Sequence, residues 1–196
     1  MSGPHRAIST QGEHTMSAAT QTQTTWQIDP AHSSVEFAVK HMMFTTVKGR
    51  FSGVAGTIVL DQQNVAASSV KATIEATTID TRDENRDNHL RSAEFFDVAR
   101  FPQITFESTN IHQTGAGEAH AHGKLTMHGV TNEVAFPVTF HGSGKSPFGT
   151  VVAGFSGGFT ISRKDYGLVW NVALETGGVM VSDNVTITLD IEAVQQ

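Results

Sequence analysis

Hydrophobic side chains recur at every second position over most of this chain, from about residue 26 onward. In the stretch SSVEFAVKH, for example, Val35, Phe37 and Val39 alternate with polar or small residues. Successive side chains of a β-strand point to opposite faces, so this pattern is typical of a strand with one dry face and one wet face. The alternation therefore predicts an all-β protein.

Eight segments carry the alternation, and short connections join all of them except the third and the fourth. Glycines at positions 49, 53 and 56 interrupt the second segment, and glycines within a strand mark bulges or sharp bends. Eight antiparallel strands of this kind favour a closed up-and-down barrel, because closure leaves no exposed edge. The segments are 33–41, about 46–60, 69–79, 103–111, 119–129, 132–141, 150–162 and 184–194.

A short helical segment is predicted at residues 81–97, between the third and fourth strands. Thr81 and Glu84 stand at capping-box spacing, and Asp87 and Arg91 are four residues apart in the favourable order. Most of this segment is charged, which indicates a solvated helix. Its predicted docking contacts are Leu90, Phe95 and Phe96.

Other features of the sequence limit which cellular location and which binding partners are expected. Residues 1–25 are polar and predict a flexible tail before a barrel domain at 26–196. No apolar run approaches the ~18 residues that span a bilayer, and no signal-peptide core is present, so a cytoplasmic location is expected. A net charge of −6 without a basic run argues against a nucleic-acid partner. The chain has 0 Cys, which excludes disulfides, thiolate metal sites and a catalytic thiol.

The dry strand faces predict what lies inside the barrel. An eight-stranded barrel is either filled by its side chains or holds one slender ligand. Composition alone favours the packed core, although 12 Phe against 1 Tyr show a preference for dry aromatic surfaces. The predicted inward set contains no acid or base: Val35, Phe37, Val39, Ile104, Phe106, Leu125, Met127, Val134, Phe136, Val138, Phe140, Phe155, Phe159, Ile161, Ile187 and Leu189.

Several histidines and one serine are candidates for a metal site, a head-group contact or a catalytic nucleophile. His120, His122 and His128 share a strand face opposite the apolar one, so a solvent-facing row without a metal is predicted. His41 falls on the inner face at a strand end, where it is either a structural histidine or a head-group ligand. Residues 154–158 satisfy G-x-S-x-G, but the alternation continues after them where a nucleophile elbow needs a helix. We therefore interpret these glycines as barrel bends.

The order of the motifs resembles that of the polyisoprenoid-binding YceI-like family over about residues 26–194. The resemblance rests on HLRSAEFFDVARFP at 89–102, LTMHGVT at 125–131 and RKDYG at 163–167. It implies a lipocalin-like barrel of eight antiparallel strands. It also implies a helical segment over one end and an amphiphile with a long isoprenoid tail threaded through the interior.

The family motif implies no catalytic residue and specifies the head-group partners only weakly. Arg163 and Lys164 lie at a strand exit, where they are either head-group donors or ordinary turn residues. Many family members carry a signal peptide and work in the periplasm, whereas residues 1–24 show none.

The expected function is therefore noncatalytic binding, storage or transport of a long-chain isoprenoid lipid, such as an isoprenoid quinone precursor or prenyl lipid. The predicted inward residues and His41 would bind this lipid, and no other cofactor is expected. A homodimer is left open. Two alternatives stand beside this hypothesis: an enzyme acting on an apolar substrate, and a stress-response module whose barrel is filled and binds nothing.

Overall fold

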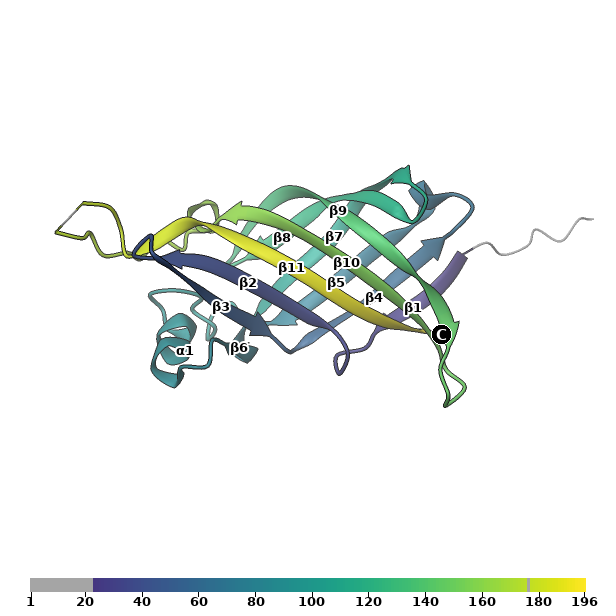
Figure 1. The fold of residues 1–196 in the computed structure, drawn as a ribbon, viewed down its shortest axis with the longest axis horizontal. Helices are drawn as coiled ribbons and strands as arrows, with labels where there is room; N and C mark the ends of the chain where they lie inside the picture. Colours follow the sequence, from purple (N-terminus) through teal and green to yellow (C-terminus); the bar gives the residue numbers. More distant parts are fainter. Residues whose placement is uncertain (1–22, 176) are drawn as a thin grey trace, which may run out of the picture.

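The computed structural model describes residues 23–175 and 177–196, which form a closed antiparallel β-barrel (Figure 1). The ring order is β1, β4, β5, β7, β8, β9, β10, β11 and back to β1, so the predicted eight-stranded barrel is confirmed. These strands are β1 Gln23–Ile28, β4 Val54–Asp61, β5 Ser69–Glu75, β7 Gln103–Gly115, β8 Glu118–Met127, β9 Val130–Lys145, β10 Val151–Ser162 and β11 Val181–Gln195.

Three further strands extend the wall at one end of the barrel: β2 Ser34–His41, β3 Thr45–Phe51 and β6 Ile79–Asp80. β2 pairs with the first part of β11 and β1 with its last part, so both run along the same neighbour. Residues 29–33 loop out between them. β3 likewise leads into β4 after a break at residues 52–53.

The strand that closes the ring was not among the eight predicted segments. β1 pairs with both β4 and β11, and its Trp26 is buried, with Nε1 donating to Thr24 Oγ1 at 2.8 Å. The predicted tail boundary is wrong by three residues, because 23–25 pair with 59–61 of β4. Residues 1–22 of that tail lie outside the described part of the chain.

The helix is shorter than predicted and begins differently. α1 spans Glu84–Arg91, and its N-cap is Asp83, which accepts from the Arg86 backbone N at 3.0 Å. Thr81 lies before the helix and donates both its N–H and its hydroxyl to Asp87. The predicted pairing of Asp87 with Arg91 is therefore wrong.

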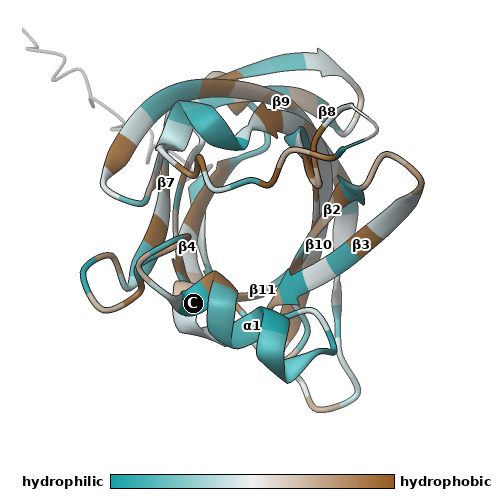
Figure 2. Ribbon diagram, turned by 90° about the vertical axis from the view of Figure 1, so that its left-hand side faces the viewer, coloured by the Kyte–Doolittle hydropathy of each residue, from teal (hydrophilic) through white to brown (hydrophobic). Residues whose placement is uncertain are grey.

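Arg91 instead holds the helix onto the preceding segment. Its guanidinium donates to the carbonyl oxygens of Thr77 and Ile79 at 2.9 and 2.7 Å. Residues 92–100 continue in turns, and Phe95 of this stretch is buried against the rings of His89 and Trp170. Figure 2, a view along the barrel, shows α1 lying beside the opening at this end.

The glycines of the G-x-S-x-G sequence act as strand residues. The pairing of β9 with β10 shifts register between Gly154 and Phe155, as expected for a bulge. A Cβ at Gly157 would stand 2.9 Å from the Pro137 carbonyl oxygen, so the close approach of the strands requires glycine there. Ser156 Oγ lies 2.7 Å from Nε2 of His141, whose side chain is exposed. The chain continues as strand β10 after Ser156, where a nucleophile elbow would need a helix.

Within the described ranges, 23–175 and 177–196, no helix has the length and apolar character needed to cross a membrane.

Candidate functional site

A cavity of about 870 Å³ occupies the barrel interior. This volume lies within the range of roughly 300–1,000 Å³ typical of small-molecule sites. The lining extends from Gln62 and Glu118 at one end of the barrel to His89 and Trp170 at the other. The structure therefore favours a tunnel over the packed core that composition alone favoured.

The predicted inward residues line this cavity with one exception. Val134 is absent from the wall and packs instead against the small cluster of Ile111, Ala121 and Phe136. His41, predicted at the inner end of its strand, does line the cavity. The strand periodicity thus placed almost all of the wall that it addressed, because the predicted residues lie on stretches of strand that keep their alternation.

Sequence reasoning missed a second part of the wall, which comes from β1, β4 and β5. The signal was visible in β5, where Val70, Ala72 and Ile74 alternate with polar residues, but their face was not assigned. The missed apolar lining residues of these three strands are Ile28, Val54, Ile58, Leu60, Val70, Ala72 and Ile74.

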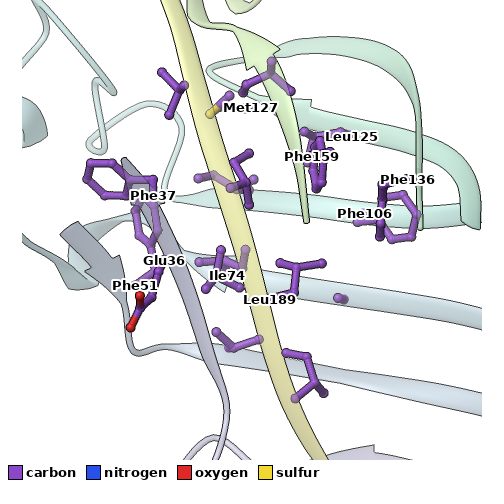
Figure 3. Close-up of a pocket in the computed structure, with 18 of the residues that line it drawn as sticks. Glu36, Phe37, Phe51, Ile74, Phe106, Leu125, Met127, Phe136, Phe159 and Leu189 are labelled. Carbon is purple, nitrogen blue, oxygen red and sulfur yellow. The ribbon is translucent and has the colours of Figure 1, made fainter. Parts of the chain in front are cut away.

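Phenylalanine rings gather in two groups along the cavity (Figure 3). Phe136 stacks on Phe159 with ring centroids 4.5 Å apart, and Phe106 tilts against Phe136 at 5.3 Å. On the other side, Phe51 lies 5.8 Å from Phe37. These rings carry no polar tip, so they offer a ligand apolar contact and no hydrogen bonds.

The two ends of the cavity differ in chemistry. One end, the α1 mouth, carries cationic groups and hydrogen-bond donors, whereas the other, the far mouth, carries amides, a hydroxyl and one carboxylate. The α1 mouth is formed by Thr81, Asn85, Arg86, His89, Arg163 and Trp170, and the far mouth by Gln62, Ser68, Gln113, Gly117 and Glu118.

Arg163, one of the two head-group candidates, lies in the α1 mouth with only 4% of its surface exposed. Its Nε donates to the Ser182 carbonyl oxygen at 3.0 Å, and Nη1 donates to those of Leu168 and Trp170. Burial lowers the pKa of this guanidinium, partly offset by Asp183. Most of Arg163 therefore fastens the loop after β10 to β11.

One nitrogen of Arg163 remains without a hydrogen bond within the described part of the chain. Nη2 is buried and lies 3.6 Å from Asp183 Oδ1. Lys164, the other candidate, does not line the cavity, and its Nζ lies 2.9 Å from Asp183 Oδ2. Of the two candidates, only Arg163 lines the cavity.

The three histidines of the predicted solvent row do not form one group. His120 and His122 are exposed on β8, as predicted. His128 is not on that face: it sits in the β8–β9 turn at φ 51°, and its Nδ1 lies 3.1 Å from the Tyr166 carbonyl oxygen. A turn residue leaves the period of its strand, which is why the alternation misplaced it.

Among the described residues, Asp29, His32 and Glu192 bring three potential metal-ligating side chains together. His32 Nδ1 is 2.8 Å from Asp29 Oδ2 and 3.6 Å from Glu192 Oε1. Hydrogen bonding to Asp29 raises the pKa of His32 and lowers that of Asp29. This group anchors the 29–33 loop against β11, outside the cavity.

Residues 26–193 match the sequence pattern of the YceI-like domain. The chain belongs to the YceI-like family. A relative, the UPF0312 protein SA2479 of Staphylococcus aureus, is 40% identical over 170 residues, which cover 86% of this chain and 96% of that protein.

Two solved structures share the barrel. BcnA of Burkholderia cenocepacia is 26% identical with a TM-score of 0.72, covering 84% of this chain and 98% of that one. A polyisoprenoid-binding domain from Saccharophagus degradans, 13% identical, superposes with a TM-score of 0.64 and covers 88% of this chain and 99% of its own. At that identity the second likeness concerns the fold alone.

Proposed function

We propose that this protein binds a polyisoprenoid, or a similar long-chain amphiphilic lipid, inside the barrel and does not transform it chemically. The observation that carries the proposal is the apolar cavity that extends from the far mouth to the α1 mouth. The name of the Saccharophagus degradans domain supports a polyisoprenoid as the lipid class.

The energetics favour a long tail. Burying one isoprene unit of about five carbons contributes roughly 4 kcal/mol at ~0.8 kcal/mol per carbon, against an affinity ceiling near −20 kcal/mol. Part of this gain is lost in ordering the tail. A tail of several units would still be retained tightly, and its length would influence affinity more than its head group.

A noncatalytic role fits the distribution of titratable groups. Those that line the cavity are Glu118 at the far mouth, Arg86, His89 and Arg163 at the α1 mouth, and Glu36, Lys40 and His41 along β2, of which Glu36 and Lys40 are exposed. The rest of the wall is predominantly aliphatic and aromatic. General acid–base chemistry needs a titratable group within hydrogen-bond reach of the reacting atom.

We place the polar head of the ligand at the α1 mouth. Arg163 Nη2 is buried there without a hydrogen-bond partner among the described residues, and a phosphate, carboxylate or carbonyl oxygen would supply one. The far mouth offers Gln62, Gln113 and Glu118, and the carboxylate would repel an anionic head.

The test is native mass spectrometry of the purified protein, followed by organic extraction and identification of the released lipid. Val138→Trp places a bulky ring in the cavity from β9. It should lower the amount of lipid recovered per mole of protein without unfolding the barrel. Ala135→Trp, at an exposed position on the same strand, is the matched control and should retain wild-type lipid content. Wild-type protein that never carries or takes up an isoprenoid lipid would contradict the proposal.

A further inference from the structure

Two loops extend beyond the barrel at the α1 mouth and expose large apolar side chains. They are the β2–β3 turn and the loop that precedes β11 (Figure 1). The Met42 backbone N donates to the Met180 carbonyl oxygen at 2.7 Å, so the two loops form one surface. We call this surface the apolar tip; it comprises Met42, Met43, Phe44, Val169 and Val172.

The side chains of the apolar tip are too exposed to be explained by packing within the fold. Phe44 is 83% exposed, Val169 64% and Met43 59%, so these side chains contribute little to the core. Met42 and Met43 also adopt φ of 50° and 63°, a left-handed conformation that favours glycine or asparagine. The turn thus presents long apolar side chains where small or polar residues would be less strained.

Charge around the turn indicates what the tip meets. In the β2–β3 turn, the sequence from 40 to 48, KHMMFTTVK, contains two exposed lysines, Lys40 and Lys48, and no acid, whereas the loop before β11 carries one exposed acid, Glu175. Apolar side chains flanked by lysines suit the boundary between acyl chains and anionic headgroups, since lysine stems extend to keep the ammonium in the polar layer. A purely apolar protein partner would leave these cations unpaired.

The tip is continuous with the cavity. His41 and Val47, on either side of the turn, line the cavity, as do Met180 and Val181 behind it. A membrane against the tip would therefore face the α1 mouth directly. An apolar tail could pass between the two without crossing water, where each exposed isoprene unit is unfavourable.

We propose that the apolar tip docks this protein on the surface of an anionic phospholipid bilayer. Docking concerns the outer surface and goes beyond the proposed function. Only the idea that docking serves to load and unload lipid from the cavity rests on the proposed function.

The experiment measures binding of the full chain, stripped of lipid, to vesicles of phosphatidylcholine alone and of phosphatidylcholine mixed with phosphatidylglycerol, by co-sedimentation. Wild-type protein should bind the mixed vesicles more strongly. Phe44→Ser should weaken this binding about tenfold or more, because a phenyl ring no longer enters the acyl layer. Lys40→Gln and Lys48→Gln should each weaken it about fivefold on the mixed vesicles.

Phe148→Ser is the matched control, since Phe148 is 96% exposed in the β9–β10 turn at the opposite end of the barrel. It should bind mixed vesicles as the wild type does. Phe44→Trp should show fluorescence quenching by brominated acyl chains, which reports insertion directly. Thermal unfolding checks that each variant keeps its fold.

Three results would overturn the docking proposal: no binding of wild type to mixed vesicles, equal losses for Phe44→Ser and Phe148→Ser, or dissociation of a homodimer by Phe44→Ser in sedimentation velocity. The last would show that a second copy covers the tip. Lipid content after extraction is measured separately, so a protein that docks but carries no lipid would contradict only the proposed function.

Discussion

The two ends of the barrel are built from the same sheet but in different ways. At the far end, the β7–β8 and β9–β10 turns are short and place glycine at positive φ, at Gly117 and Gly149. At the α1 end, a helix, two long connections and a buried guanidinium surround the mouth. A barrel needs only short turns to close its sheet, so the additional structure at the α1 end sets this mouth apart from the far one.

The largest expected effect concerns packing beneath α1. Phe51 is buried against Phe37 and edge-on to Phe96, so Phe51→Ala should lower the free energy of unfolding by ~3 to 5 kcal/mol. Phe140→Ala, nearer the far end, should reduce it by less than about 2 kcal/mol, since both rings line the cavity but Phe140 is only half-buried. Urea unfolding measures both. Equal losses would mean that the cavity is filled like an ordinary core.

Arg163→Met tests the fastening of the α1 mouth. The variant leaves the carbonyl oxygens of Leu168, Trp170 and Ser182 without this donor, which should cost about 2 to 4 kcal/mol of unfolding free energy. It should also speed ligand release. Gln113→Met at the far mouth is the control, with an expected change within about 0.5 kcal/mol. A small effect of Arg163→Met would show that the loop holds itself in place.

Replacing the strained turn should separate stability from docking. The double change Met42→Asn with Met43→Gly supplies the residues that a two-residue hairpin turn prefers, and should raise stability by about 1 kcal/mol. The same variant should bind anionic vesicles more weakly than wild type. Calorimetry and co-sedimentation give the two readings. An unchanged melting temperature would show that the backbone at 42–43 relaxes without strain.

The smallest effect is expected from the loop that joins β1 to β2. Since the pKa of His32 is raised, its pairing with Asp29 stabilises the fold below pH ~6.5 and is lost as pH rises through the folded value. Since the pKa of Asp29 is lowered, the pair is also lost in acid, as pH falls through that folded value. His32→Asn should flatten the melting temperature across pH ~5 to ~8. A wild-type slope in this variant would assign the pH dependence to other groups.

The helical segment shows where local sequence signals succeed and where they fail. Polar residues near Glu84 correctly indicated a helix, but the predicted cap, Thr81, was wrong, because several such residues compete as caps. Asp83 caps the helix, whereas the Thr81 hydroxyl donates to the buried Asp87, a contact that local sequence does not reveal. The predicted extent of the helix, 81–97, was also wrong. The helix ends at Arg91, and Phe95 reaches the core from the turns that follow it.

The sequence by itself determined the class of fold and which face of most strands turns inward. These follow from the two-residue period of a strand, which each segment shows without reference to its neighbours. It also indicated the family through motifs that the barrel keeps at one end.

Only the tertiary structure decided that β1 closes the ring, that the barrel interior contains an open cavity and that His128 leaves the strand face. Closure needs both partners of β1, and Gln23–Ile28 is too short to show its role alone. The width of the interior depends on strand tilt and stagger around the whole ring. A period of two records the direction of a side chain but not the distance to the opposite wall.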